Sequence, residues 1–311
     1  MSHPKPIIID CDPGIDDAVA LFLAMALDSL DVKAIITVAG NMPLAVTERN
    51  ARCLVELAQR SQVKVYGGCP RPLLRSPLFA RHVHGDNGLG GMLLPDPQVP
   101  LQPTHGVTAL IEILRQSPEL VSLATLGPLT NLAVALVQAP DIASAIAEIV
   151  IMGGAMRAGN VTPSAEFNFY ADPHAAQIVM DSGIPLTLIG LDVTHQVIAT
   201  PPRLERIRQL QNPVAQAVVE MVSRYGSTDQ QVLGLVGPPL HDPCVIAYLV
   251  QPDLFETKPG YVAIETASDL NLGRSVVDFQ GLMGHLPNAT VALSIDSVGF
   301  YELLLEALSL Y

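Results

Sequence analysis

The sequence contains no tryptophan, and basic residues are scarce. The chain has 311 residues, of which 15% are charged, and its 17 lysines and arginines are outnumbered by 30 aspartates and glutamates, for a formal net charge of −13. Phosphate backbones and anionic membrane surfaces attract clusters of basic side chains. The composition therefore predicts neither a nucleic acid nor a membrane as partner.

Cysteine is also rare and widely spaced. Cys11, Cys53, Cys69 and Cys244 form no CxxC pair, which argues against a zinc ribbon and against a disulfide framework. No apolar run reaches the length of a membrane span, and the three isoleucines before Asp10 are too few for the core of a signal peptide. We expect a cytoplasmic protein with reduced thiols.

Apolar residues, in contrast, make up 49% of the chain and follow two alternating patterns. Short β-branched runs predict strands at Ile7–Asp10, Val32–Val38, Val63–Tyr66, Leu120–Leu126, Glu148–Met152 and Pro185–Leu191. Segments with helical periodicity lie between them, at Asp16–Leu27, Ala45–Gln59, Val107–Arg115, Pro128–Val137 and Pro173–Ser182. This alternation is typical of βαβ units.

The early strands are almost continuously apolar, as expected when helices cover both faces of a parallel sheet. We therefore predict one α/β domain over residues 1–311, with a mainly parallel, open, Rossmann-like sheet. Three later segments lack long helices between them and are predicted to form an antiparallel edge: Tyr261–Glu265, Arg274–Val277 and Thr290–Ile295. Long loops are predicted at Pro70–Thr104 and Gly153–Ala171.

Four aspartates lie within eight positions directly after the first predicted strand, in the stretch DCDPGIDD at 10–17. Capping of the next helix accounts for one or two of them. It does not account for all four, because crowded carboxylates raise one another's pKa unless a cation or hydrogen-bond donors compensate them. Ligands of open α/β sheets bind beyond the carboxyl ends of the strands, where these residues lie.

These acids predict a metal site. Oxygen ligands without accompanying cysteine or histidine pairs favour calcium or magnesium over zinc. Asp242, in the stretch HDP, also follows a Gly/Pro turn and precedes an apolar segment. It is therefore a candidate to complete the site from a distant part of the chain.

An ordered set of motifs resembles the nucleoside hydrolases, which are metal-dependent N-ribohydrolases, and most closely the pyrimidine-preferring and inosine–uridine types. The motifs cover almost the whole chain: DCDPGIDDAVA at 10–20, VAGN at 38–41, HGDNGL at 84–89, GPLTN at 127–131, IMGGA at 151–155, TPSAEFNFYADPHAA at 162–176 and HDP at 241–243. The resemblance implies hydrolysis of the N-glycosidic bond of ribonucleosides, which yields ribose and free base for nucleoside salvage. It also implies a homotetramer.

The resemblance assigns roles around a calcium ion. Asp12, Asp17 and Asp242 match carboxylate ligands, and Leu126 matches a ligand that acts through its main-chain carbonyl. Asp12 also matches the general base that accepts a proton from the attacking water, whose pKa the metal lowers.

The resemblance further implies a ribose pocket of carboxylates and amides. Asp16 and Asn168 match contacts of the ribose diol, Asn160 and Glu166 match residues around the 5′ hydroxyl, and Asn41 and Met152 match further pocket positions. Cleavage builds positive charge on the ribose ring, so oxygen-rich surroundings stabilise the transition state more than the ground state.

His241 and His84 are the candidates for protonating or contacting the departing base, because imidazole titrates near neutrality. His241 is the predicted catalytic residue of the two, since it adjoins Asp242. Pyrimidine-preferring relatives often carry an aromatic residue shortly before the HDP histidine, whereas this sequence has none from 229 to 243, and Tyr225 is the nearest. Base preference therefore stays open between pyrimidines such as uridine or cytidine and purines such as inosine.

Two alternatives remain. A magnesium-dependent phosphatase with an aspartyl nucleophile shares the DxD pattern, but its motif usually has threonine or valine where Gly14 stands, and no lysine here is suited to hold the phosphate. A catalytically silent ribose or nucleoside binder could retain the same ligands.

Overall fold

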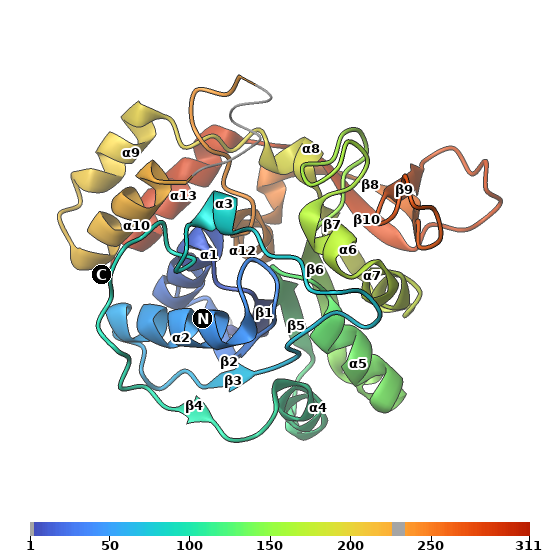
Figure 1. Ribbon diagram of the computed structural model, residues 1–311, viewed down its shortest axis with the longest axis horizontal. Helices are drawn as coiled ribbons and strands as arrows, with labels where there is room; N and C mark the ends of the chain where they lie inside the picture. Colours follow the sequence, from blue (N-terminus) through green and yellow to red (C-terminus); the bar gives the residue numbers. More distant parts are fainter. Residues whose placement is uncertain (1–2, 226–233) are drawn as a thin grey trace.

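The computed structural model describes residues 3–225 and 234–311. Its strands form one sheet in the order β4-β3-β2-β1-β5-β6-β7-β10-β8-β9 (Figure 1). The strands are β1 (Lys5–Cys11), β2 (Leu30–Thr37), β3 (Val65–Gly67), β4 (Leu101–Gln102), β5 (Val121–Thr125), β6 (Ile146–Met152), β7 (Leu186–Ile189), β8 (Phe255–Ile264), β9 (Ser275–Asp278) and β10 (Ala289–Ile295).

The sheet is parallel from β4 to β7, as predicted. The antiparallel C-terminal edge is also confirmed, because β8 pairs antiparallel with both β10 and β9. One detail differs from a purely antiparallel edge. Strand β10 pairs in parallel with β7, with Thr290 opposite Thr187, and so joins the edge to the parallel part.

Helices cover both faces of the sheet. Figure 1 shows α1 (Ile15–Ala26), α2 (Leu44–Leu57), α10 (Pro213–Ser223), α12 (Pro243–Val250) and α13 (Ser297–Leu308) on one side, and α4 (Gly106–Gln116), α5 (Thr130–Gln138) and α7 (Pro173–Met180) on the other. The remaining elements are α3 (Arg81–His84), α6 (Phe167–Ala171), α8 (Leu191–Thr194), α9 (Pro201–Arg208) and the 3₁₀ turns η1 (Pro140–Ala145) and η2 (Pro252–Leu254).

The isoleucine run of β1 explains this arrangement. Ile7 and Ile9 pack into the core beneath α1, and Ile8 packs into the core on the opposite face. Because successive side chains of a strand point to opposite faces, a strand covered on both sides needs an apolar residue at every position.

The two predicted loops contain short elements that the sequence pattern did not reveal. Helix α3 and the two-residue strand β4 lie within 70–104, and α6 lies within 153–171. Elements of two to five residues are too short for a hydrophobic period to be recognised. Within the described ranges, no helix combines the length and apolar character needed to cross a bilayer.

Asn131, which is fully buried, holds together the loops at the carboxyl ends of the strands. Its Nδ2 donates to Asp10 Oδ1 at 3.0 Å and to the carbonyl of Thr37 at 3.1 Å, and its Oδ1 accepts from the backbone N–H of Cys69 at 2.7 Å. One amide thus joins the ends of β1 and β2 to the segment after β3.

Asp172, also fully buried, does the same on the other side of the site. Its Oδ2 accepts from the hydroxyl of Thr130 at 2.7 Å and from the N–H of Leu73 at 2.9 Å, and its Oδ1 caps α7 by accepting from Ala175 N at 3.2 Å. This carboxylate therefore connects a helix start to two distant segments.

We predict that Asp172→Ala lowers the free energy of unfolding by about 3 kcal/mol, because it leaves buried donors without an acceptor. Asp296→Ala is the matched control, since Asp296 is an exposed cap of α13 whose carboxylate accepts from the neighbouring Val298 and Gly299 N–H groups. It should cost about 1 kcal/mol. Urea unfolding measures both, and equal losses would contradict the connecting role.

Candidate active site

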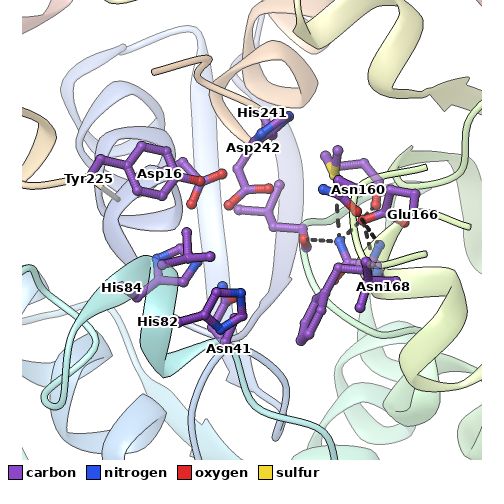
Figure 2. A pocket seen from close by; sticks show the side chains of 16 residues that line it. Asp16, Asn41, His82, His84, Asn160, Glu166, Asn168, Tyr225, His241 and Asp242 are labelled. Atoms are coloured by element: carbon purple, nitrogen blue, oxygen red, sulfur yellow. Dashed lines mark hydrogen bonds between the residues drawn. The ribbon is translucent and has the colours of Figure 1, made fainter. Parts of the chain in front are cut away.

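A pocket lies beyond the carboxyl ends of the parallel strands, where the sequence placed the site. Ten of the predicted residues line it: Asp16, Asn41, His84, Leu126, Met152, Asn160, Glu166, Asn168, His241 and Asp242. Figure 2 shows the carboxylates of Asp16 and Asp242 next to each other, with Tyr225 and His84 on one side and Asn160, Glu166 and Asn168 on the other.

The other two predicted residues, Asp12 and Asp17, are buried next to the pocket and bonded to Asn41, which lines it. Asp12 Oδ2 accepts from the N–H of Asn41 at 2.6 Å, and Asp17 Oδ2 accepts from Asn41 Nδ2 at 3.2 Å. The structure therefore brings all the predicted residues to one region.

The turn between β1 and α1 is organised by Asp17. Its Oδ1 accepts from the N–H of Asp12 at 3.1 Å, and its Oδ2 accepts from the N–H of Gly14 at 2.9 Å. The carboxylate of Asp12 then fits between two glycines, because a Cβ at Gly40 or at Gly127 would collide with it. Glycine is required at both positions by this close approach.

Three carboxylates gather at the pocket. Ligand oxygens of Asp16, Asp17 and Asp242 all lie within 4.8 Å of one another, and the three side chains are buried. Asp16, which the resemblance places at the ribose diol, thus lies within the acidic group itself. Within the described residues, one oxygen of Asp16 and one of Asp12 are buried without a hydrogen-bond partner.

Burial, and after it the charge of neighbouring carboxylates, raises the pKa of Asp12, Asp16 and Asp242. The pKa of Asp16 rises to about 7, and a hydrogen bond from Tyr225 partly opposes this rise. Burial likewise raises the pKa of Asp12, Asp17 and Asp242. Buried, mutually repelling oxygens without sufficient donors fit a hard divalent cation, which would hold them ionised.

Amides and a capping carboxylate form the opposite wall of the pocket. Asn168 Nδ2 donates to the carbonyl of Leu126 at 2.7 Å and to that of Met152 at 3.1 Å, and so bridges the ends of β5 and β6. Glu166 caps α6 by accepting from the N–H groups of Asn168 and Phe169, and it also accepts from Gly154 N.

Asn160 completes this wall. Its Oδ1 accepts from the N–H of Phe167 at 3.0 Å, which fixes the loop before α6. A second cavity, of about 800 Å³, adjoins the same loop, and Asn160 and Val161 line both cavities.

His84 is held as a neutral imidazole. Its Nδ1 accepts from the N–H of Ile15 at 3.1 Å, so the ring hydrogen is on Nε2. Burial, with smaller contributions from His241 and His82, lowers the pKa of His84 to about 3. The contact at Nδ1 and the lowered pKa both favour a neutral His84 that donates from Nε2 near neutral pH.

The sequence left the reach of Tyr225 undecided, and the stretch GLDVTH at 190–195, which contains Thr194, indicated only a structural role. Tyr225 lines the pocket, and its ring lies 5.3 Å from that of His84, centroid to centroid. Thr194 Oγ1 lies 2.7 Å from Nδ1 of His241. Residues 229–233 of the stretch without aromatics lie outside the described residues. The aromatic residue that lines the pocket is Tyr225, which stands just before that stretch in the sequence.

The profile of the inosine-uridine preferring nucleoside hydrolases matches residues 7–302. The chain belongs to the nucleoside hydrolase family. Two curated relatives named pyrimidine-specific ribonucleoside hydrolase RihA cover 98% of this chain and 99% of their own length over 307 residues. The one from Salmonella gallinarum is 45% identical and the one from Escherichia fergusonii is 46% identical.

Solved structures of nucleoside hydrolases have the same fold. The purine-preferring ribonucleoside hydrolase from Gardnerella vaginalis is 31% identical, with a TM-score of 0.92 and coverage of 98% of both chains. The plant nucleoside hydrolase PpNRh1 is 32% identical, with a TM-score of 0.92 and coverage of 98% of this chain and 99% of its own. This nucleoside hydrolase is thus an N-glycosyl hydrolase that acts on ribonucleosides, which argues against the phosphatase alternative.

The raised pKa values predict a pH-dependent response to metal. The pKa of Asp16 rises from 3.8 to about 7 on folding without metal, so the folded chain holds more protons and loses stability as pH rises through that window. A cation needs ionised ligands. Added calcium should therefore raise the unfolding temperature more at about pH 8 than at about pH 5.

Thermal unfolding with and without calcium at about pH 5 and about pH 8 measures the rise in unfolding temperature that calcium causes at each pH. Asp242→Asn should lose the calcium response, whereas Asp253→Asn, at an exposed aspartate, should keep it. A response of equal size at both pH values would contradict the prediction.

Proposed function

We propose that this nucleoside hydrolase cleaves pyrimidine ribonucleosides such as uridine and cytidine in a calcium-dependent reaction that supplies nucleoside salvage. The buried group of Asp16, Asp17 and Asp242 beside the pocket carries the proposal. The names of the two relatives above support the pyrimidine preference, while the Gardnerella enzyme makes inosine the second substrate to test. From the family resemblance we also propose a cytoplasmic homotetramer.

Asp12, Asp17, Asp242 and the carbonyl of Leu126 would hold the calcium ion. Calcium takes six to eight oxygen ligands, so protein groups, ribose hydroxyls and water would share the coordination. The carbonyl of Leu126 already accepts from Asn168. A carbonyl oxygen has two lone pairs, so this bond is compatible with a second role as ligand.

Calcium, when bound, lowers the pKa of a water molecule next to the anomeric carbon. Asp12 accepts the proton of that water as general base, and its buried oxygen without a partner in the described chain supports this role. The electron pair of the C1′–N bond leaves with the base. In the overall reaction, water adds across this bond and one of its protons ends on the base.

The pocket walls hold the sugar in our proposal. Asp16 and Asn168 bind the ribose diol, Asn160 and Glu166 surround the 5′ hydroxyl, and Asn41 and Met152 complete the pocket. Carboxylate and amide oxygens near the ring stabilise the positive charge that develops there in the transition state.

His241 and His84 lie on the base side, and His241 is the proposed catalytic donor. Both rings line the pocket. A donor near the departing base stabilises the charge that the base gains as the bond breaks.

We predict that the purified protein releases uracil from uridine with calcium and stops after chelation. Asp12→Asn keeps the size of the side chain but removes the base, so kcat should fall by about 10²- to 10⁴-fold. Asp28→Asn, at an exposed aspartate, is the control and should match the wild type.

A panel of uridine, cytidine, inosine, adenosine and thymidine ranks the bases. Faster cleavage of inosine than of uridine would contradict only the pyrimidine preference and would leave the proposed hydrolysis of ribonucleosides in place. Binding of ribose without release of any base would contradict the enzymatic proposal and support the silent binder.

A further inference from the structure

Thr194 is the buried partner of His241. Thr194 ends the short helix α8, and His241 comes directly before the N-cap of α12, 47 residues later. The hydroxyl oxygen and the ring Nδ1 are 2.7 Å apart. The side chain of Thr194 is fully buried and that of His241 is nearly so, which makes this a polar contact inside the protein.

The direction of this hydrogen bond follows from the surroundings of the hydroxyl. Among residues 3–225 and 234–311, Nδ1 of His241 is the one side-chain hydrogen-bond partner of Thr194. If the ring donated from Nδ1, the hydroxyl hydrogen would be buried without an acceptor, which is costly. The hydroxyl therefore donates, and Nδ1 accepts.

A neutral imidazole that accepts at Nδ1 carries its hydrogen on Nε2. His84 has the same arrangement, since its Nδ1 accepts from the N–H of Ile15. The imidazoles of His84 and His241, both in the pocket lining, thus have their Nδ1 atoms fixed by different groups, a backbone amide and a side-chain hydroxyl, with the same result for Nε2.

We propose that Thr194 is a positioning residue for the departing base. By donating to Nδ1 it keeps His241 in the Nε2–H form and in the ring orientation that donates a hydrogen bond to the base as the C1′–N bond breaks. His195 contacts the same ring edge to face, with 5.8 Å between ring centroids, so α8 and its C-cap hold the imidazole from two directions. This inference rests on the proposed function and deepens it.

The test compares two leaving groups in Thr194→Val, which keeps the shape of threonine without its hydroxyl. Uracil needs a donor to leave, whereas the p-nitrophenolate of p-nitrophenyl β-ribofuranoside is a stable anion without one. In Thr194→Val, kcat for uridine should fall roughly 10- to 100-fold, as for other partners that orient an imidazole. KM for uridine and the rate with the p-nitrophenyl riboside should stay unchanged.

Thr194→Ser keeps the hydroxyl and should restore uridine cleavage. Thr187→Val is the matched control, because Thr187 is a buried threonine of β7 whose hydroxyl contacts Tyr248. In this variant the ratio of the rate with uridine to the rate with the p-nitrophenyl riboside should not change. An equal loss on both substrates in Thr194→Val would show a merely structural role and overturn the proposal. An unchanged rate with uridine would overturn it as well.

Ring ¹⁵N chemical shifts of His241 test the inference without any turnover. The wild type should show the Nε2–H form at a pH where the ring is neutral, and Thr194→Val should lose this preference. A wild-type ring protonated on Nδ1 would overturn the inference. Failure of the wild type to cleave any nucleoside would instead contradict the proposed function, and the shifts would still decide the role of Thr194.

Discussion

The site depends on carboxylates that the chain buries together without enough donors to neutralise them. Asp16, Asp17 and Asp242 meet where the first turn of α1 and the N-cap of α12 come close, and one oxygen of Asp16 has no hydrogen-bond partner in the described chain. Such repulsion is unfavourable for the isolated fold and is relieved when a cation binds. The tight contacts around Asp12, with its flanking glycines, and the capping of the turn by Asp17 keep the acids close in spite of this repulsion.

The groups around the acids form two sets, one on each side of the pocket. On the side proposed to bind the sugar, Asn168 and Glu166 are joined to each other and to the ends of β5 and β6 by hydrogen bonds, so the protein's own groups hold this wall. On the side proposed to face the base, the imidazoles of His84 and His241 are each held through Nδ1, and Tyr225 lies against His84 and Asp16. Preformed donors and acceptors of this kind stabilise a transition state without reorganising during the reaction.

The sheet and the acidic turn were predictable from the sequence because each depends on residues that are adjacent in the chain. The isoleucines of β1 are read directly as a strand covered on two faces, and the four aspartates that follow cannot all be caps. Contacts between distant segments were not predictable in this way. Thr194 and Tyr225 reach the site only through the packing of α8 and of the end of α10, and no local pattern distinguishes a threonine that touches His241 from one that does not. Strand β4 was missed because two residues show no period.

The cavity behind Asn160 and Val161 gives the two walls of the pocket different tolerance to change. The acidic side is backed by α1, whose residues are all buried, so an enlargement there would have to displace packed core. The loop of Asn160 and Val161 instead borders a cavity of about 800 Å³, so a change there meets less packed core. With Asn160 and Glu166 proposed to surround the 5′ hydroxyl, sugars with bulkier 5′ groups would be accommodated by re-modelling this loop, whereas a new chemistry at the acids would require the redesign of the protein interior.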